Sequence, residues 1–327
     1  MMFTQLFTQC SRAQFPPSIK MSQTPLQKYL FLGYVNTRST KPNVGRRQLK
    51  LKVIEQFWKL DLAQKNEQIK IASLCVASTE EPTAFEPESD PYDIPGLKDS
   101  RVIGTRGIVV RTHFDSNDEP AWDAFLTILE ELERKSLADV PNIQMESDSD
   151  SEEDEEEDEE MAKAGPPPIT YESDAIFTVV DPVKQEAYQA WRDKLSNASN
   201  IALLRLFNDA SIVPSPSPPA TAPKRIKPGH RLIDEDGFQE VYSGGTIWVW
   251  DHQSAKNQSV RLVSPQVFVY GDATGDSWRV RVAHIWELQL NLDDGMRIDF
   301  SGGVGAGWDM DERARNLKES TSYVDSE

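Results

Sequence analysis

Cysteine is scarce in this chain of 327 residues, which contains Cys10 and Cys75 and no third. Two cysteines cannot build the disulfide framework of a small secreted protein, and neither belongs to a CxxC or Cys/His pattern typical of structural zinc. A reducing compartment fits this usage best. Long apolar runs are also missing, because no stretch approaches the ~20 residues that a bilayer-spanning helix needs. We therefore predict no membrane partner.

Catalytic motifs are missing as well. The sequence has no GxSxG elbow, and neither cysteine has an evident base nearby. The glycine-rich residues 302–307 (GGVGAG) lack the lysine of a P-loop and the strand–helix context of a dinucleotide loop. Without a nucleophile or a phosphate loop, the sequence favours a non-enzymatic protein with no cofactor.

Histidine is rare, and no two of the four histidines have HxxxH spacing: His113, His230, His252 and His284. One metal hypothesis remains, in which Asp251 and His252 at a strand end meet Asp272 or Asp276 in space. Turns rich in Asp and Gly are common without metals, so we predict no metal site. His284 and His113 are interpreted as sheet residues, with His113 beside Asp115.

Charge is distributed very unevenly along a chain of net charge −18. Residues 1–54 contain nine Lys or Arg and no acid, whereas residues 146–160 contain twelve acids and no base. Such an acidic protein repels phosphate backbones, which argues against nucleic-acid binding outside the basic first 54 residues.

The acidic stretch 146–160 is the most distinctive feature. It cannot bury apolar surface and repels itself, so we expect disorder. Acidophilic kinases prefer serines with an acid three residues later, a pattern that marks Ser147, Ser149 and Ser151 as phosphorylation sites. The stretch is interpreted as a polyanionic arm that binds basic proteins; the alternative is a solvated insertion that keeps the protein soluble.

The N-terminus allows two interpretations. Apolar residues share one helical face there, and arginine and lysine follow without acids, as in mitochondrial transit peptides. The alternative is a disordered basic tail, or an extension upstream of a start at Met21. We predict a cytoplasmic or nuclear protein, and a mitochondrial one if residues 1–54 act as a transit peptide.

The first half of the chain reads as strands followed by helices. A helix is possible over 46–77, and the proline-rich residues 78–98 read as a linker. The β-branched residues 107–114 predict a strand, Asp115 to Asp118 offer helix caps, and apolar spacing over 122–132 predicts an amphipathic helix. The second unit is a strand over 175–180 and a helix over 183–195. The apolar run 201–207 is interpreted as a third strand.

The second half changes to an apolar–polar alternation typical of antiparallel strands. It is seen over 238–242, 246–251, 259–264, 267–270, 278–292 and 296–300. Turn pairs such as Gly244-Gly245 and Asp294-Gly295 separate several of them. We expect an α+β fold, two strand–helix units followed by an antiparallel meander with residues 285–292 as its central strand.

The domain organisation follows from these patterns. Residues 1–98 are predicted to be a basic, mostly disordered extension, and residues 99–303 one domain. Disordered insertions are expected at 136–172, which is acidic, and at 208–232, which is proline-rich. Residues 304–327 are predicted to be a disordered tail.

Several short blocks resemble a small domain of unknown function found in bacteria and fungi. Residues 109–115 (VVRTHFD) with 120–122 (PAW) resemble its opening "VRTDF" strand and "DDAAW" helix, with His113 in place of the usual aspartate. Residues 178–182 (TVVDP) resemble its second strand, and 271–279 (GDATGDSWR) with 287–292 (ELQLNL) the closing strands of fungal members. The resemblance implies one fold unit over about residues 100–303 and supplies no chemistry.

The alternative is a domain that binds a small anionic ligand, or an enzyme, with a cleft around Arg111, Arg279 and Glu287. Arg111 and Arg279 are charged residues within apolar strands, and Glu287 could pair with one of them. The residues of this hypothetical ligand site are Arg111, Arg279, Glu287, Trp278 and Trp286. Trp248 and Trp250 share one strand face, where we expect a core rather than a binding platform. The oligomeric state is not predicted.

Overall fold

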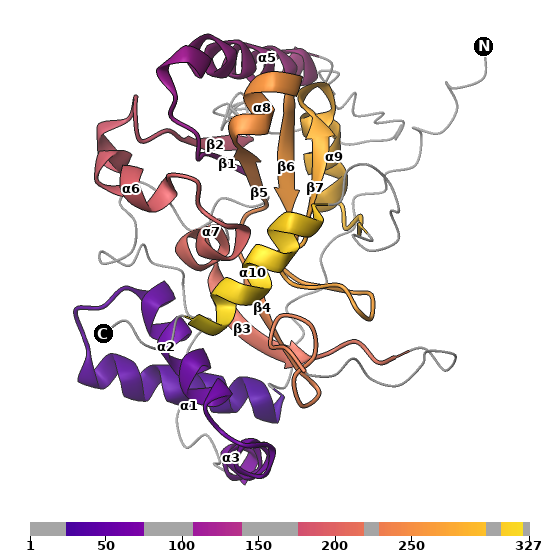
Figure 1. Cartoon of the computed structure of the whole chain (residues 1–327). Helices are drawn as coiled ribbons and strands as arrows, with labels where there is room; N and C mark the ends of the chain where they lie inside the picture. The colour runs from indigo at the N-terminus through magenta and orange to yellow at the C-terminus, as the bar shows by residue number, and fades with distance from the viewer. Residues whose placement is uncertain (1–23, 75–106, 139–175, 219–228, 299–308, 323–327) are drawn as a thin grey trace, which may run out of the picture.

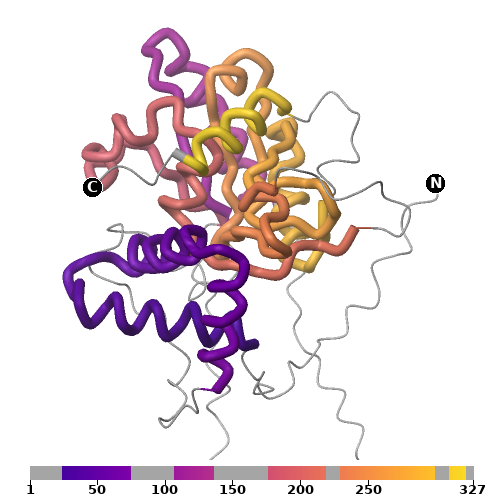
Figure 2. The backbone as a smooth tube through the Cα atoms, turned by 60° about the horizontal axis from the view of Figure 1, so that its bottom comes forward, coloured from indigo at the N-terminus to yellow at the C-terminus, as the bar shows by residue number. Residues whose placement is uncertain are grey.

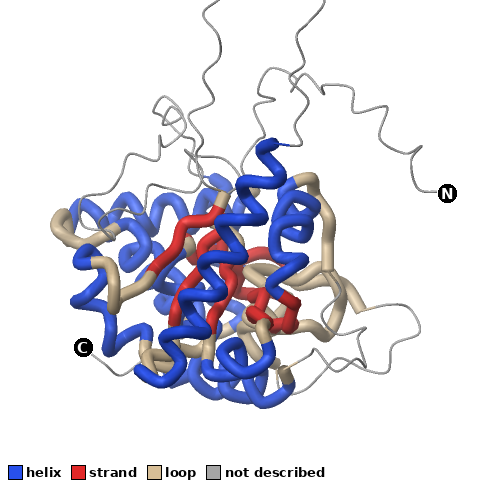
Figure 3. The backbone as a smooth tube through the Cα atoms, turned by 90° about the horizontal axis from the view of Figure 1, so that it is seen from above, coloured by secondary structure: helices blue, strands red, loops and turns tan. Residues whose placement is uncertain are grey.

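The computed structural model of the chain describes residues 24–74, 107–138, 176–218, 229–298 and 309–322 (Figure 1). A five-stranded mixed sheet and a separate two-stranded sheet are surrounded by helices. The α+β class predicted from the sequence is therefore confirmed. In Figure 3 the strands lie inside, with helices around them.

The larger sheet has the strand order β2-β1-β5-β6-β7. Its strands are β1 (Gly107–Arg111), β2 (Phe177–Val180), β5 (Ile247–Trp250), β6 (Ser259–Val263) and β7 (Ser277–Arg281). β1 pairs in parallel with both β2 and β5, and the register places Val109 between Val179 and Trp248. β6 and β7 are antiparallel additions to β5. The predicted meander is thus limited to β5-β6-β7, and β5 joins it to the two strand–helix units.

Helices cover both faces of this sheet. One face packs Val109, Trp248 and Trp250 in a single core with α5 (Glu119–Ala138), α8 (His252–Asn257) and α9 (Ile285–Asp293). The other face packs Val110 and Val249 against α6 (Arg192–Leu195) and α7 (Asn200–Phe207). Short 3-10 turns connect these elements: η1 (Ser116–Asp118), η2 (Glu186–Trp191) and η3 (Val282–His284). The burial of Trp248 and Trp250 confirms that they are core residues.

The smaller sheet pairs β3 (Asp209–Pro214) with β4 (Phe238–Ser243) in antiparallel register. Three N-terminal helices pack beside it: α1 (Pro25–Thr40), α2 (Arg46–Trp58) and α3 (Leu62–Leu74). In Figure 2 these indigo helices lie together along one side of the rest. Leu26, Ile54 and Phe57 belong to the same core as Ile212 of β3. The prediction of a mostly disordered extension over 1–98 is therefore wrong for residues 24–74.

The start of α1 explains why the chain folds there. Thr24 accepts a hydrogen bond from the backbone N–H of Gln27, and the Gln27 side chain accepts one from the N–H of Thr24. This reciprocal capping box, with Pro25 at the first helical position, satisfies amides that have no partner within the helix. The expected helix over 46–77 is two helices, because the chain turns between Trp58 and Leu62.

Two segments expected as strands are helices. Residues 201–207 lie in α7, whose N-cap Ser199 accepts a hydrogen bond from the N–H of Ala202 at 3.0 Å. Residues 285–292 lie in α9, which buries Ile285, Trp286 and Gln289 against the sheet. The side-chain cap at Ser199 favours a helix in α7, whose residues are buried on nearly every side. In α9 the buried residues recur at helical spacing.

Two segments expected to be disordered carry structure. β3 occupies part of the predicted insertion 208–232, and α10 (Met310–Ser322) occupies most of the predicted tail 304–327. Glu312 and Asn316 of α10 accept hydrogen bonds from the N–H groups of Asn200 and Ile201, so α10 caps the first turn of α7. Residues 267–270, expected as a strand, form a loop.

Several predictions fall on residues outside the described ranges. They are the basic start before residue 24, the linker 78–98, the acidic stretch 146–160, residues 139–172 and 219–228 of the two insertions, and the glycine run 302–307. Within the described ranges, no helix has both the length and the apolar character required to cross a bilayer.

Candidate functional site

Polar residues gather where the three parallel strands β2, β1 and β5 end. Asp181 follows β2, Thr112 and His113 follow β1, and Asp251 and His252 follow β5. β1 lies between β2 and β5. The chain passes from β1 through α5 to β2 on one side, and it reaches β5 on the other side much later (Figure 1). In open parallel sheets, ligands bind outside the carboxyl ends of the strands at such a change of direction. We call this region the carboxyl edge.

Arg111, the last residue of β1, organises the interior of the carboxyl edge and is fully buried. Its guanidinium contacts Glu119 Oε2 at 2.5 Å and Asp181 Oδ2 at 3.3 Å, and its Nε donates to the His113 carbonyl at 3.0 Å. The hydrogen bond from Arg111 holds the pKa of Glu119 below its ordinary value. These contacts occupy the guanidinium, so Arg111 fixes the loop after β1 instead of facing a ligand.

Two tryptophans complete the surroundings of this arginine. Its guanidinium lies 5.2 Å from the Trp122 ring centroid and 5.5 Å from that of Trp250. The Trp122 indole N–H donates to Asp181 Oδ2 at 2.7 Å, so the buried carboxylate receives a second donor. Cation–π contacts and paired charges together offset the desolvation of a buried arginine.

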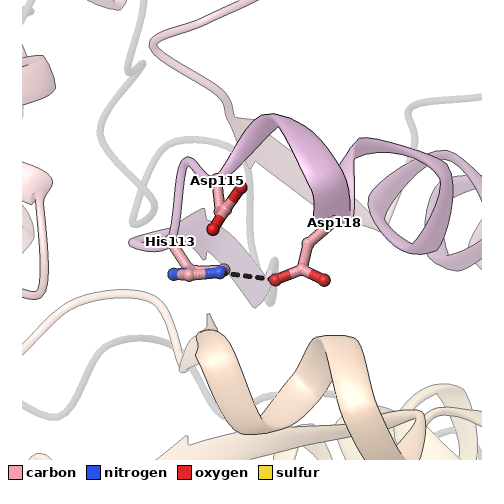
Figure 4. A group of neighbouring side chains, drawn as sticks. All are labelled: His113, Asp115 and Asp118. Carbon is pink, nitrogen blue, oxygen red and sulfur yellow. Dashed lines mark hydrogen bonds and ion pairs between the residues drawn. The ribbon is translucent and has the colours of Figure 1, made fainter.

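His113, Asp115 and Asp118 form a compact group above this support, called the His–Asp cluster (Figure 4). His113 Nε2 lies 2.7 Å from Asp118 Oδ2. Asp115 caps the 3-10 turn η1, and its Oδ1 accepts from the Asn117 N–H at 2.9 Å. One ligand-type atom from each of the three side chains lies within 4.8 Å of the others. The imidazole is half-buried and Asp115 is exposed, so solvent reaches the cluster.

A second histidine approaches from the neighbouring strand. His252 is the first residue of α8, directly after β5, and its ring centroid lies 5.8 Å from that of His113. Lys256, one turn later, places Nζ 2.8 Å from His252 Nε2. Asp251 fixes this helix start by accepting from the N–H groups of Gln253 and Ser254. The side chains of two non-adjacent segments therefore meet at the carboxyl edge.

A pocket of about 340 Å³ lies between α5 and α8. It is lined by small and apolar side chains of α5, including Ala121, Ala124 and Phe125, and by residues 254–257 of α8. Trp250 borders both the pocket and the His–Asp cluster, since its ring centroid lies 6.0 Å from that of His113.

The residues predicted to hold an anionic ligand do not form one cleft. Arg111 shares a sheet face with Trp250, whereas Arg279 is in register with Arg261 and Val249 on the opposite face. Arg279 is neutralised by Asp251, whose Oδ2 lies 2.5 Å from its Nη2. The expectation that strand arginines pair with carboxylates is correct, with Asp251 and Asp181 as partners instead of Glu287.

The other three residues of the predicted ligand site lie elsewhere. The Glu287 side chain is 76% exposed and faces His284 at 3.9 Å. Trp278 is 42% exposed, whereas Trp286 is buried and packs on Phe177 with ring centroids 6.3 Å apart. The ligand-site prediction is therefore corrected, because strand alternation and the separation of β7 from α9 place its members in different surroundings.

The metal hypothesis built on Asp251 and His252 is also corrected. Asp251 binds Arg279 and Arg261, and Asp276 binds Arg313. Burial opposes ionisation of Asp251, but these arginines keep its pKa below the ordinary value. Among the described residues, the group with metal-ligand proximity is the His–Asp cluster instead. The HxDxxD spacing over 113–118 is the signal in the sequence that could have indicated it. Ser147, Ser149 and Ser151 lie outside the described residues.

Comparisons with protein-family models, curated proteins and solved structures found no match to this chain.

Proposed function

We propose that the protein is a non-enzymatic interaction module that binds basic proteins through its acidic stretch 146–160. The observation that carries this proposal is the density of charge, twelve acids in fifteen residues with no base. Such a segment attracts a basic partner over a Debye length of ~8 Å at physiological salt. Apolar burial contributes little to this attraction, because the stretch contains no apolar residue.

The folded part supports this proposal through the way it uses its own charges. Arg205 of α7 and Arg231 flank the buried Glu240 of β4, at 3.3 and 3.4 Å. Burial opposes ionisation of Glu240, but the two arginines keep its pKa below the ordinary value. Together with Arg111 and Arg279, these arginines are committed to carboxylates of the same chain. These four arginines neutralise internal acids and are not free to pair with the acidic stretch.

The position of the stretch in the fold also supports the proposal. It belongs to the connection between α5, which ends at Ala138, and β2, which begins at Phe177. This connection enters β2 at its amino end, and β2 leads away from it to the carboxyl edge. The backbone N–H of Phe177, at the start of β2, donates to Glu133 of α5 at 3.0 Å, so both ends of this connection are anchored at the edge of the sheet opposite the His–Asp cluster.

Phosphorylation is the proposed regulation of this binding. Ser147, Ser149 and Ser151 lie inside the stretch, and each phosphate adds about −1.5 to −2 charges at neutral pH. Three phosphates would therefore add ~5 charges to a local charge of −12. We also propose that the protein acts in the cytoplasm or nucleus, with the mitochondrion as the alternative if residues 1–54 direct import.

The test measures binding of a fluorescent lysine-rich peptide to the full chain. We expect binding that weakens steeply between 50 and 300 mM salt. In a neutralised variant, all twelve acids of 146–160 are replaced by the corresponding amides, and binding should fall at least tenfold. Treatment with an acidophilic kinase should strengthen binding in the original chain.

A scrambled variant is the matched control, because it keeps the composition of residues 146–160 and changes their order. It should bind as the original chain does, since the attraction depends on charge density. Equal binding by the neutralised variant and the original chain would refute the proposal.

A further inference from the structure

We propose that His113, Asp115 and Asp118 bind one divalent first-row transition-metal ion, of the class of Mn²⁺ or Zn²⁺. The site lies at the carboxyl edge, where the loop after β1 meets the start of α8. It is separate from the acidic stretch that carries the proposed function.

The donor set points to this class of ion. One imidazole nitrogen and two carboxylate oxygens suit Mn²⁺, Zn²⁺ and related ions, whereas Mg²⁺ and Ca²⁺ are typically bound by oxygen alone. The two carboxylates balance the charge of a divalent ion. The exposed side of the cluster leaves room for water or an exogenous ligand to complete the coordination.

The geometry requires little rearrangement. Nitrogen and oxygen ligands lie about 2.0–2.2 Å from such an ion, so neighbouring ligand atoms on one ion are about 3 Å apart. His113 Nε2 and Asp118 Oδ2 are already 2.7 Å apart. All three ligand atoms fall within 4.8 Å of one another, so small side-chain rotations of Asp115 and Asp118 complete the set (Figure 4).

The supporting contacts lie outside the cluster. The His113 carbonyl accepts from the buried Arg111 guanidinium at 3.0 Å, which fixes the backbone that carries the imidazole. Arg111 also binds Glu119, the residue after Asp118. Such outer contacts orient metal ligands and are part of the affinity of natural metal sites.

Two further observations favour a ligand at this place. The cluster lies where the strand order changes direction, the position at which open parallel sheets bind their ligands. A second imidazole, His252, comes from a different strand–helix junction, with its ring 5.8 Å from that of His113. Lys256 holds this ring through Nε2, which makes His252 a neighbour of the ion in this arrangement and not one of its three ligands.

The experiment titrates Mn²⁺ into the full chain and follows free Mn²⁺ by electron paramagnetic resonance. Because twelve acids in 146–160 also attract cations, the titration is repeated in the neutralised variant. We expect one Mn²⁺ per chain in that variant, displaced by equimolar Zn²⁺ and not by equimolar Mg²⁺.

Three conservative substitutions test the ligands in the same background. Asp115→Asn retains the N-cap, since Asn caps as well as Asp, and removes only the charge. We expect Asp115→Asn, Asp118→Asn and His113→Gln each to weaken Mn²⁺ binding at least tenfold with an unchanged melting temperature. His284→Asn is the matched control, because His284 is another surface histidine beside a carboxylate, Glu287, and should leave Mn²⁺ affinity unchanged.

The outcomes separate this inference from the proposed function. Loss of all Mn²⁺ binding on neutralising 146–160, or undiminished binding in Asp115→Asn and Asp118→Asn, would overturn the metal site. Neither result affects binding of the lysine-rich peptide, which depends on the acidic stretch.

Discussion

Arg111 shows how a buried charge is made tolerable in this protein. Its guanidinium lies among two tryptophan rings, two carboxylates and a carbonyl, while Asp181 is itself only 2% exposed. A buried ion pair adds little net stability, but removal of one partner leaves the other charge buried without compensation. The carboxyl edge therefore depends on this residue even though Arg111 touches no solvent.

The first prediction concerns this arginine. Arg111→Met should lower the free energy of unfolding by about 3–5 kcal/mol, because Asp181 loses its cation. Urea unfolding at neutral pH measures the change. Lys184→Ala is the comparison, since Lys184 is 41% exposed and pairs with Glu119 at 3.4 Å. An exposed pair contributes at most ~1 kcal/mol, so similar losses in the two variants would contradict our interpretation.

Asp276 gives a pH-dependent prediction. Burial raises its pKa to about 6 from an ordinary 3.8, against the charge of Arg313 and a hydrogen bond from the Ala273 N–H. Between these two values the folded state holds a proton that the unfolded state has released. The contribution of this group to stability therefore falls as pH rises through that range.

Asp276→Asn removes this titration. The unfolding free energy of the variant minus that of the original chain should rise from pH 4 to pH 6 and stay level above pH 7. Urea unfolding at intervals of half a pH unit measures the difference. The exposed Glu287→Gln variant is the control, and the same rise in both variants would argue against a special role of Asp276.

At the scale of elements, sequence patterns predicted correctly those elements whose structure depends on neighbouring residues in the chain. The strand–turn–helix unit from β1 to α5 follows from a β-branched run, Asp caps and apolar spacing, and all three agree. α1 carries an equally local signal, the Thr24 and Gln27 capping box with Pro25. The unusual charge of residues 1–54 obscured this signal, although it does not prevent the helix.

Other elements depend on packing that is absent from the local sequence. Residues 285–292 alternate as a strand does, yet α9 buries Ile285, Trp286 and Gln289 and leaves Leu290 exposed. Gln289 accepts from the buried Trp248 indole at 2.7 Å, a tertiary contact that local periodicity cannot reveal. The short apolar run 201–207 is compatible with either structure, because it is buried almost all round.

The candidate site was predictable only in part for the same reason. His113 and Asp115 follow from the end of a predicted strand, and Asp118 lies on the same turn. The approach of His252 depends on β5 pairing with β1, although more than a hundred residues separate them in sequence. The sequence could not show that Arg111 and Arg279 lie on opposite faces of the sheet, because this depends on the strand order and register.

Two glycines allow a matched prediction for the loop that contacts α7. Gly275 and Gly295 have φ of +88° and +92°, where other residues are strained. A Cβ on Gly275 would lie 2.8 Å from Ile201 Cδ1, whereas one on Gly295 would meet nothing within 4 Å. Gly295→Ala should cost about 1–2 kcal/mol, and Gly275→Ala about 1–3 kcal/mol more through overpacking. Thermal unfolding ranks them, and equal costs would contradict the packing of α7 described above.

On the scale of the whole molecule, the N-terminal helices belong to the folded unit. Besides their apolar contacts, Lys50 binds Asp209 of β3 at 2.7 Å, and Glu55 of α2 binds Arg231 at 3.0 Å. Asp209 is buried, and Arg46 and Lys50 of α2 neutralise its charge.

A truncation tests this organisation. A chain beginning at residue 99 should lose its cooperative thermal transition or aggregate, because it exposes the core beside β3 and leaves Asp209 without α2. A chain beginning at Met21 keeps all three helices and is the control, with a single transition like that of the full chain. Circular dichroism at increasing temperature reports both. Cooperative melting of the shorter chain at the original temperature would show that residues 1–98 are dispensable.

The connection between α5 and β2 divides the chain into two interlocked halves. The first half supplies α1–α3, β1 and α5, and the second supplies both neighbours of β1 and the whole smaller sheet. A single proteolytic cut between residues 139 and 175 would therefore release neither half. The nicked protein should elute as one particle in size-exclusion chromatography and separate only in denaturant, because the pairing of β1 with β2 and β5 holds the two fragments together.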